Sequence, residues 1–153
     1  MSRVEGDVLV PAPLHEVFEF ASDWQKWPEW WVGVSAFRPT TEIVRGNGAR
    51  YAYKARLMGI WANVETEIRE FREDAGWTGV ATKGMPHHTY WLFESQGEQT
   101  RFTYALEYRL PVPVFGPLLD SLVVGPQWRR IIDCALNNLK SHFADRTGSS
   151  DGA

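Results

Sequence analysis

The segment from Gly116 to Phe143 is the longest helical pattern in the chain, and it constrains the fold more than any other feature. Its apolar residues recur at steps of three and four, the spacing of an amphipathic helix. They are Leu118, Leu119, Leu122, Val123, Ile131, Ile132, Ala135, Leu136, Leu139 and Phe143. A helix of about 40 Å, at about 1.5 Å per residue, needs a broad apolar surface to cover this stripe. The preceding sequence has to provide that surface.

Gly125 and Pro126 interrupt the helical pattern. Proline removes a helical hydrogen bond and clashes with the carbonyl group four residues earlier, here that of Leu122. At about 100° per residue, the apolar residues before the interruption fall on a different side from those after it. The sequence therefore predicts a kink or break at Val124–Pro126. The C-terminal piece is expected to anchor on a sheet, and the N-terminal piece, Leu118 to Val123, is expected to act as a lid over the space between sheet and helix.

The rest of the chain reads mostly as strands. Val4 to Val10 alternates as a first strand, and Pro13 opens a helix that a second, short helix follows after Asp23. From Gly33 onward the pattern has period two, and most breaks are short turns, which predicts antiparallel hairpins. The predicted strands lie near Val34–Ile43, Arg50–Leu57, Trp61–Phe71, Trp77–Lys83, His88–Glu94 and Arg101–Leu110.

The side-chain pattern of these strands indicates one covered face. Val64, Thr66 and Ile68 alternate with charged residues, which is typical of an antiparallel sheet that is buried on one side. The carboxylates Glu65, Glu67 and Glu70 then lie on the solvated face. Two strands stay open in their orientation. Parity does not separate Trp77, Gly79 and Ala81 from Thr78, Val80 and Thr82, and Tyr90 and Leu92 make the second face of the His88 strand apolar too. The same parity predicts an inner face of Tyr51, Tyr53, Ala55, Leu57, Thr89, Trp91, Phe93, Phe102, Tyr104, Leu106 and Tyr108.

The chain is rich in large aromatic side chains, with eight Trp, eight Phe and five Tyr in 153 residues. Such residues often line apolar pockets. Four of the Trp fall between Trp24 and Trp31, where Pro28 prevents a long helix. Two interpretations stay open for this cluster. It is a plug that packs one end of the domain, which the usual role of Trp favours, or an aromatic gate beside a pocket.

Composition restricts location and partners. The length of 153 residues fits one domain, predicted to span residues 1–144, with a polar, disordered tail over residues 145–153. A net charge of −3 favours neither nucleic acid nor an anionic membrane. Cys134 is the single cysteine, and no run approaches the roughly 18 apolar residues of a membrane span. We therefore expect a cytoplasmic protein without stable membrane insertion, a monomer or weak homodimer.

The sequence lacks the known enzyme signatures: it has no Gly-rich phosphate loop, no Cys-x-x-Cys, no His-Glu-x-x-His and no Gly-x-Ser-x-Gly motif. No cofactor and no metal site is predicted. His87 and His88 are adjacent on a strand, so they point to opposite faces and do not readily chelate one ion. The sequence favours interpreting the pair as the polar start of a strand. His87 shares its parity with Thr89 and Trp91, so it is the member of the pair that would face inward and act as acid or base.

The N-terminal motifs resemble a known family. Val10-Pro11-Ala12-Pro13-Leu14-His15-Glu16-Val17-Phe18, then Asp23 and Trp27-Pro28-Glu29-Trp30, look like the polyketide cyclase/dehydrase-like branch of the SRPBCC superfamily. That superfamily includes StAR-related lipid-transfer and birch-pollen-allergen-like proteins, and the resemblance covers about residues 3 to 143. It implies an α+β helix-grip fold, in which a seven-stranded curved antiparallel sheet wraps on the long C-terminal helix. It also implies a deep apolar cavity between sheet and helix.

Three functions remain open. The first is binding of a hydrophobic or aromatic small molecule, lipid- or polyketide-like, in that cavity. The second is a cofactor-free enzyme of the cyclase, dehydratase or aromatase type, for which His87, Tyr53 and Tyr104 are the candidate catalytic residues. The third is a protein–protein module like the heat-shock-ATPase activators.

The predicted ligand-binding residues follow from the inner face and the lid. The tyrosines among them combine an apolar ring with one hydroxyl, which suits a pocket wall and a packed core equally. The full set is Tyr51, Tyr53, Leu57, Trp77, Trp91, Phe93, Tyr104, Tyr108, Leu118 and Leu122.

Overall fold

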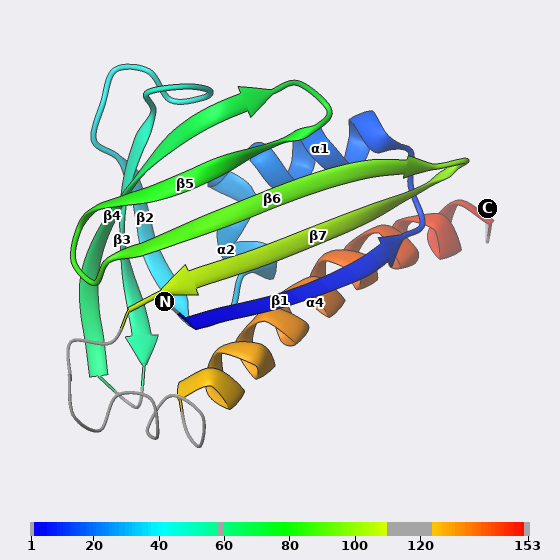
Figure 1. The fold of residues 1–153 in the computed structure, drawn as a ribbon. Helices are drawn as coiled ribbons and strands as arrows, with labels where there is room; N and C mark the ends of the chain where they lie inside the picture. Colours follow the sequence, from blue (N-terminus) through cyan, green and yellow to red (C-terminus); the bar gives the residue numbers. More distant parts are fainter. Residues whose placement is uncertain (1, 58–59, 110–123, 152–153) are drawn as a thin grey trace.

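A computed structural model describes residues 2–57, 60–109 and 124–151. Its core element is one antiparallel sheet of seven strands in the order β1-β7-β6-β5-β4-β3-β2 (Figure 1). The strands are β1 (Ser2–Val10), β2 (Val34–Pro39), β3 (Arg50–Leu57), β4 (Ile60–Arg72), β5 (Gly76–Lys83), β6 (His87–Gln96) and β7 (Gln99–Tyr108). The helices are α1 (Leu14–Ser22), the 3-10 turn η1 (Trp24–Lys26), α2 (Trp27–Trp30) and α4 (Gly125–Asp151). This order confirms the predicted α+β helix-grip fold.

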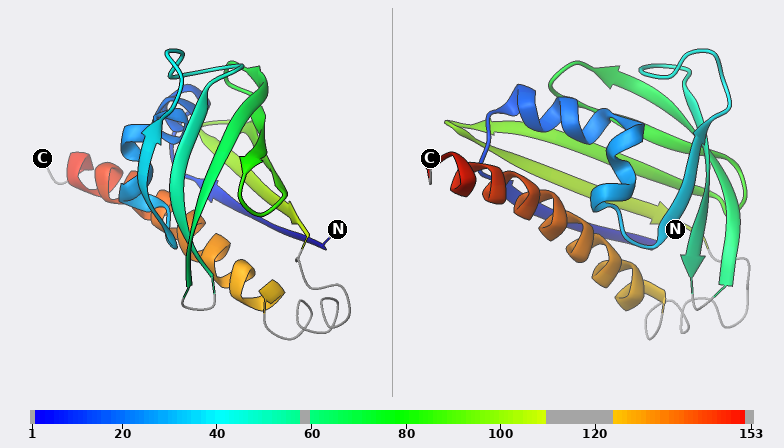
Figure 2. Two further views of the ribbon diagram at one scale, coloured as in Figure 1. Left: turned by 90° about the vertical axis from the view of Figure 1, so that its left-hand side faces the viewer. Right: turned by 180° about the vertical axis from the view of Figure 1, so that it is seen from behind.

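The sheet curves around its helices (Figure 2). Its strands turn their inner face toward α1, α2 and α4, and α4 lies along β1 on that side. The approach of α4 to β1 is close at Gly6, where an added Cβ would lie 3.1 Å from the side chains of both Ile132 and Leu136. A larger residue at this position would push the helix away from the sheet, so Gly6 fixes the distance between the two elements.

Helix α4 begins at the position where the sequence predicts an interruption. Pro126 is the second residue of α4, which runs from Gly125 to Asp151. The residues that α4 buries include Ile132, Leu136 and Leu139, which belong to the predicted stripe. The predicted N-terminal piece, Leu118 to Val123, lies outside the described residues, so its role as a lid stays a prediction.

The C-terminal end of α4 reaches Asp151. It therefore runs through most of residues 145–153, the segment that the sequence predicts to be a disordered tail. None of the helices in the described ranges is long and apolar enough to cross a membrane.

Strand β2 ends at Pro39, earlier than the predicted Val34–Ile43, and a β-bulge interrupts it. The register with β3 shifts between Ser35 and Arg38, and Ala36 takes a positive φ of 57°. The bulge turns Phe37 to the inner face, where it packs edge-on against Trp27. The chain then leaves the sheet after Pro39 and returns at β3.

Two local features shape the segment between α1 and β2. The side chain of Asp23 accepts a hydrogen bond from the backbone N–H of Gln25 at 3.0 Å, which caps η1. The indole Nε1 of Trp27 donates to the carbonyl oxygen of Ala21 at 2.8 Å. The first bond stabilises the start of η1, and the second ties α2 to the end of α1.

The outer face carries the charged residues, as predicted, with one difference. Glu107 on β7 accepts a hydrogen bond from Arg3 on β1 at 2.7 Å, a pair that joins neighbouring strands. Glu65 differs because only 6% of it is exposed although it lies on the outer face. Its carboxylate accepts a 2.6 Å hydrogen bond from the Thr82 hydroxyl, which compensates its partial loss of water.

Candidate functional site

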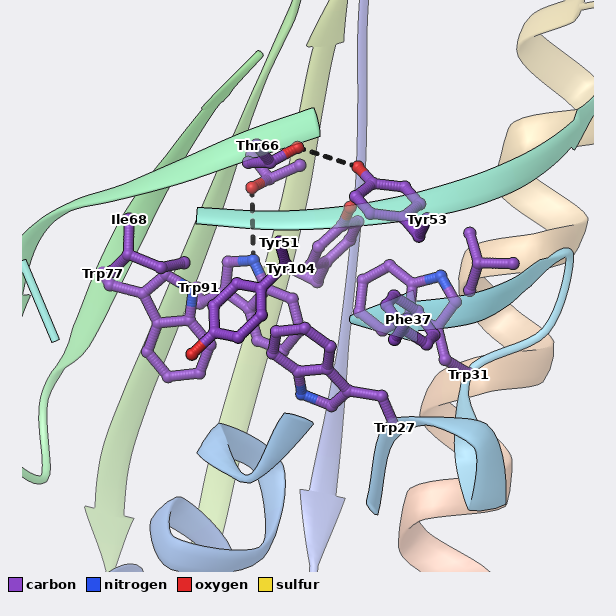
Figure 3. Close-up of a pocket in the computed structure, with 12 residues that line it drawn as sticks. Trp27, Trp31, Phe37, Tyr51, Tyr53, Thr66, Ile68, Trp77, Trp91 and Tyr104 are labelled. Atoms are coloured by element: carbon purple, nitrogen blue, oxygen red, sulfur yellow. Dashed lines mark hydrogen bonds between the residues drawn. The ribbon is translucent and has the colours of Figure 1, made fainter. Parts of the chain in front are cut away.

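Two adjoining cavities lie between the inner face of the sheet and the helices. We name the first the aromatic chamber (Figure 3). Its walls come from α2 and the segment after it, from the bulged strand β2, and from β3 to β7. Its volume is about 50 Å³. The lining residues are Trp27, Trp31, Val34, Phe37, Tyr51, Tyr53, Thr66, Ile68, Trp77, Thr89, Trp91 and Tyr104.

The rings of the aromatic chamber are arranged around Trp91. The indole of Trp77 stacks on Trp91 with ring centroids 4.5 Å apart, and the indole of Trp31 stacks on Trp91 with ring centroids 4.9 Å apart. The planes of both pairs are inclined by 24°. Tyr104 meets Trp31 edge-on at 5.0 Å. Flat rings that already stack in this way offer a planar apolar surface.

The second cavity is the histidine chamber, which extends toward the turn between β5 and β6 and the start of α4. Its volume is about 100 Å³. Trp31, Val34, Tyr53, Thr89 and Tyr104 line both chambers, so the two spaces adjoin. The other lining residues are Ala55, Ala62, Val64, Met85, His87, Leu106 and Trp128.

A chain of hydrogen bonds runs through the wall that the chambers share. His87 Nδ1 lies 2.8 Å from the carbonyl oxygen of Met85, and because a carbonyl only accepts, Nδ1 carries the proton. In the neutral ring Nε2 is then an acceptor, and it lies 3.3 Å from the hydroxyl of Tyr53. That hydroxyl is also 2.9 Å from Thr66 Oγ1. The Tyr53 O–H donates to His87 Nε2 when Thr66 donates to Tyr53.

Burial keeps these groups uncharged. It lowers the pKa of the His87 imidazole, against a smaller opposing effect of the Met85 carbonyl. It raises the pKa of the Tyr53 hydroxyl to about 12, and that of Tyr104 well above its usual value of 10. At neutral pH all three are therefore neutral. His87 then presents a basic lone pair, and the tyrosines present O–H donors.

Two donors in the walls have no partner among the described residues. The hydroxyl of Tyr104 takes part in no hydrogen bond there, although the residue is only 5% exposed. The indole Nε1 of Trp128 is buried and also unpaired. Both residues line the histidine chamber. Trp30 Nε1 is a third unpaired donor, in a small space between β7 and α4 that Tyr104 and Trp128 also border.

The structure brings six of the sequence-predicted site residues together. Tyr51, Tyr53, Trp77, Trp91 and Tyr104 line the aromatic chamber, and His87 lines the histidine chamber. His87 is only 6% exposed and shares the inner face with Thr89 and Trp91, as its parity predicts. Both strands that the sequence left open are oriented: Trp77 of β5 and Trp91 of β6 face inward.

Two predicted residues lie elsewhere, and three cannot be placed. Phe93 packs in the core, where it stacks on Phe102 with centroids 4.6 Å apart and contacts Phe18 of α1. Tyr108 is fully buried near Trp128 at the end of β7. Neither lines the chambers, because α1 and α4 cover the two ends of the inner face. The side chain of Leu57, and Leu118 and Leu122 entirely, lie outside the described residues.

Sequence reasoning missed several lining residues. The Trp cluster between Trp24 and Trp31 was the strongest indication of further lining residues, but the sequence favoured a packing role for all four of its Trp residues. That role fits Trp30, which is 2% exposed, whereas Trp27 and Trp31 line the aromatic chamber. The other lining residues not predicted as ligand-binding are Val34, Phe37, Ala55, Ala62, Val64, Thr66, Ile68, Met85, Thr89, Leu106 and Trp128.

The curved antiparallel sheet, the long C-terminal helix and the aromatic pocket between them define a protein of the helix-grip class. The chain belongs to the family described as "Polyketide cyclase / dehydrase and lipid transport", whose model matches residues 1–144. This membership confirms the resemblance that the N-terminal motifs indicate.

Solved structures share the fold at low sequence identity. The protein TTHA0849 from Thermus thermophilus is 23% identical with a TM-score of 0.81, covering 95% of this chain and 99% of that one. A START superfamily protein from Mycobacterium smegmatis is 17% identical with a TM-score of 0.72, covering 92% and 97%. The di-domain ARO/CYC BexL from the BE-7585A biosynthetic pathway is 19% identical with a TM-score of 0.68, covering 95% and 47%. No curated protein matches the chain.

Proposed function

We propose that the protein binds a hydrophobic or aromatic small molecule, lipid- or polyketide-like, in the aromatic and histidine chambers. The observation that carries this proposal is the composition of the walls. They consist of aromatic and aliphatic side chains with a few hydroxyl groups and one imidazole, the mixture that small-molecule pockets use. Membership of a family whose description names polyketide cyclases and lipid transport supports the same conclusion.

The size of the chambers adds a requirement. At about 50 and 100 Å³, each holds only a few water-sized groups. A ligand with two or more fused rings has to occupy both. Trp31 lines both chambers and stands after the last turn of α2, in a segment without helix or strand. We infer that Trp31 moves when such a ligand enters.

The test begins with the protein purified from cells. Extraction into organic solvent followed by mass spectrometry identifies any compound that co-purifies. Titration of planar apolar compounds then reports binding through quenching of tryptophan fluorescence, because Trp27, Trp31, Trp77 and Trp91 line the aromatic chamber. Trp61 is 50% exposed on β4, so a Trp61→Phe variant lowers the background and serves as the host protein. A protein that carries no compound and quenches with none would contradict the proposal.

One observation favours an enzyme of the cyclase, dehydratase or aromatase type as a second candidate. His87 Nε2 is a buried, neutral base that contacts the Tyr53 hydroxyl at 3.3 Å, and Tyr104 presents a free hydroxyl to the same space. In such a reaction His87 would take a proton from carbon or oxygen, and Tyr104 would donate to a carbonyl oxygen.

The enzyme proposal is tested on a compound that the extraction identifies. His87→Asn keeps a donor for Met85 O and removes the base, whereas Tyr53→Phe and Tyr104→Phe remove single hydroxyls. His88→Asn is the matched control, because His88 points to the opposite face of β6. Loss of turnover in the inner-face variants alone supports the enzyme. Equal turnover in all four would remove these residues from the mechanism.

The cytoplasmic location and the monomer or weak homodimer state remain predictions. The single cysteine, Cys134, is free and exposed on α4, which is compatible with a reducing compartment. Light scattering coupled to size-exclusion chromatography measures the oligomeric state directly.

A further inference from the structure

The polar groups of the chamber walls are mostly paired with one another. Trp27 Nε1 donates to a backbone carbonyl at 2.8 Å, and Trp91 Nε1 donates to Thr89 Oγ1 at 3.2 Å. The hydroxyl of Tyr51 donates to the carbonyl oxygen of Val44. These groups are satisfied without a ligand, so they contribute shape rather than recognition.

The groups without a partner are donors. The Tyr104 hydroxyl and Trp128 Nε1 are unpaired within the described ranges, and both residues line the histidine chamber. An indole N–H only donates, and a tyrosine hydroxyl donates readily. A buried donor without an acceptor is unfavourable. The Tyr104 hydroxyl is not among the fully buried donors, so it is open to the chamber, and an acceptor oxygen on the ligand would give it a partner.

The part of the walls that the structure describes offers no charged side chain to balance a charge on the ligand. Among the described residues that line the two chambers, none is Asp, Glu, Lys or Arg. His87 is held as a neutral ring, with Nδ1 bound to Met85 and Nε2 to Tyr53. A carboxylate, phosphate or ammonium group in this space would lose its water without gaining a counter-charge, which costs far more than burying a neutral group.

The walls also prefer a flat partner. The Trp31 and Trp77 rings lie nearly parallel to Trp91 at stacking distance. A planar ring that replaces Trp31 against Trp91 would keep this stacking and would place its edge near Tyr104, since Tyr104 contacts both Trp31 and Trp91 edge-on.

We infer that the ligand is an uncharged planar aromatic molecule with a carbonyl oxygen, that Tyr104 is the specificity-determining residue that donates to that oxygen, and that ligands with an ionised head group are excluded. This inference rests on the proposed function and narrows it. It predicts that aromatic ketones bind and that fatty acids and phospholipids, which carry an ionised head group, do not. This distinction matters because the family description also names lipid transport.

The test uses three compounds with one skeleton: 2-acetylnaphthalene, 2-ethylnaphthalene and 2-naphthoate. All three share the flat naphthalene rings. The first carries a carbonyl group, the second an apolar group of similar size, and the third a charged carboxylate. Equilibrium dialysis at neutral pH measures the dissociation constant of each. One net hydrogen bond should make the ketone bind about three- to tenfold more tightly than the hydrocarbon. The naphthoate should bind more than about tenfold more weakly than the ketone.

A variant assigns the effect to one hydroxyl. Tyr104→Phe should weaken binding of the ketone to the level of the hydrocarbon and leave the hydrocarbon unchanged. Tyr90→Phe is the control, because Tyr90 lies on the outer face and donates to Glu107 at 3.1 Å. Circular dichroism checks that both variants fold. The ratio of the dissociation constants of the ketone and the hydrocarbon is also measured on the unaltered protein, so this part of the test does not depend on a variant that folds.

The outcomes separate the inference from the function on which it rests. Equal affinities for the ketone and the hydrocarbon, or tight binding of the naphthoate, would overturn the inference and leave apolar binding intact. A ketone preference that survives in Tyr104→Phe would overturn the role of Tyr104. If none of the three binds, the proposed function fails and the inference fails with it.

Discussion

The indole of Trp31, which lines both chambers, stacks on that of Trp91, which lines the aromatic chamber, with ring centroids 4.9 Å apart. Trp91 is fixed in the middle of β6, between the neighbouring strands β5 and β7. Trp31 follows α2 and is half-buried, and two residues later Gly33 takes a positive φ of 80°. The rigid half of the stack therefore belongs to the sheet, and the half that can move belongs to a connecting segment.

Replacing Trp31 with alanine should join the chambers. The variant should bind bulky apolar ligands faster, because no ring has to move before entry, as stopped-flow fluorescence would measure. The free energy of unfolding should fall by about 2 kcal/mol, less than for a fully buried Trp. Trp61→Ala is the control, since that ring is exposed and should change neither quantity much. Unchanged association rates in Trp31→Ala would show that Trp31 does not limit entry.

Gly79 on β5 should tolerate no side chain. An added Cβ would lie 2.4 Å from Thr89 Oγ1 and 2.9 Å from Thr66 Cγ2, which are atoms of the chamber floor. Gly79→Ala should therefore destabilise the protein by about 1–3 kcal/mol through overpacking.

A double-mutant cycle tests the origin of this cost. Thr89→Ala removes the closest atom, so Gly79→Ala combined with Thr89→Ala should be less destabilised than the sum of the single variants. Urea denaturation measures all three. Strict additivity would show that the clash with Thr89 is not the cause.

The strands that could be oriented from the sequence are those in which apolar and charged residues alternate. Strands β4 and β7 alternate between apolar and charged residues, and the inner positions Val64, Tyr104 and Leu106 follow from parity alone. Strand β5 has no such contrast around Trp77, and only its pairing with Trp91 on β6 decides its orientation. Parity is a local signal, and this strand required information from its neighbour.

The less predictable part of the site depends on irregular backbone. Phe37 reaches the aromatic chamber because β2 bulges at Ala36, which takes a positive φ. The sequence has no glycine or asparagine at this position that would indicate a bulge with positive φ. Trp31 lines both chambers because α2 ends one residue earlier. An aromatic cluster around Pro28 identifies a corner of the fold, but it does not tell which rings face the core and which face the pocket.

Arg45 should stabilise the loop between β2 and β3. Its guanidinium pairs with Glu73 at 2.9 Å and with Glu19 of α1 at 3.1 Å, and it lies 5.1 Å from the centre of the Phe71 ring. All of these groups are partly exposed, so Arg45→Met should cost only about 1 kcal/mol. The cost should shrink in high salt, because screening weakens the ion pairs.

The matched control for Arg45 is Lys26→Met. Lys26 makes a single exposed ion pair with Glu29 at 3.8 Å. Its removal should change the free energy of unfolding little at any salt concentration. If the two variants behave alike in urea denaturation at low and high salt, the Arg45 network contributes no more than an ordinary surface pair.

His87 should make the protein less stable in mild acid. Burial lowers its pKa in the folded state below the value of about 6.5 that holds in the unfolded chain. Below about pH 6.5 the unfolded state therefore binds more protons than the folded state. The stabilisation is fully present above the unfolded pKa and is lost as the pH falls toward the folded pKa.

His15 should act in the opposite direction, which makes it the control. Its exposed ring pairs with Asp74 at 2.9 Å, and this carboxylate raises the pKa of His15. That contribution is present below the unfolded pKa and is lost as the pH rises through the folded pKa. Urea denaturation from about pH 5 to 8 should show a flatter profile for His87→Asn, and a steeper loss in acid for His15→Asn, than for the unaltered protein. If the free energy of unfolding of His87→Asn depends on pH as steeply as that of the unaltered protein, His87 is not a buried neutral base.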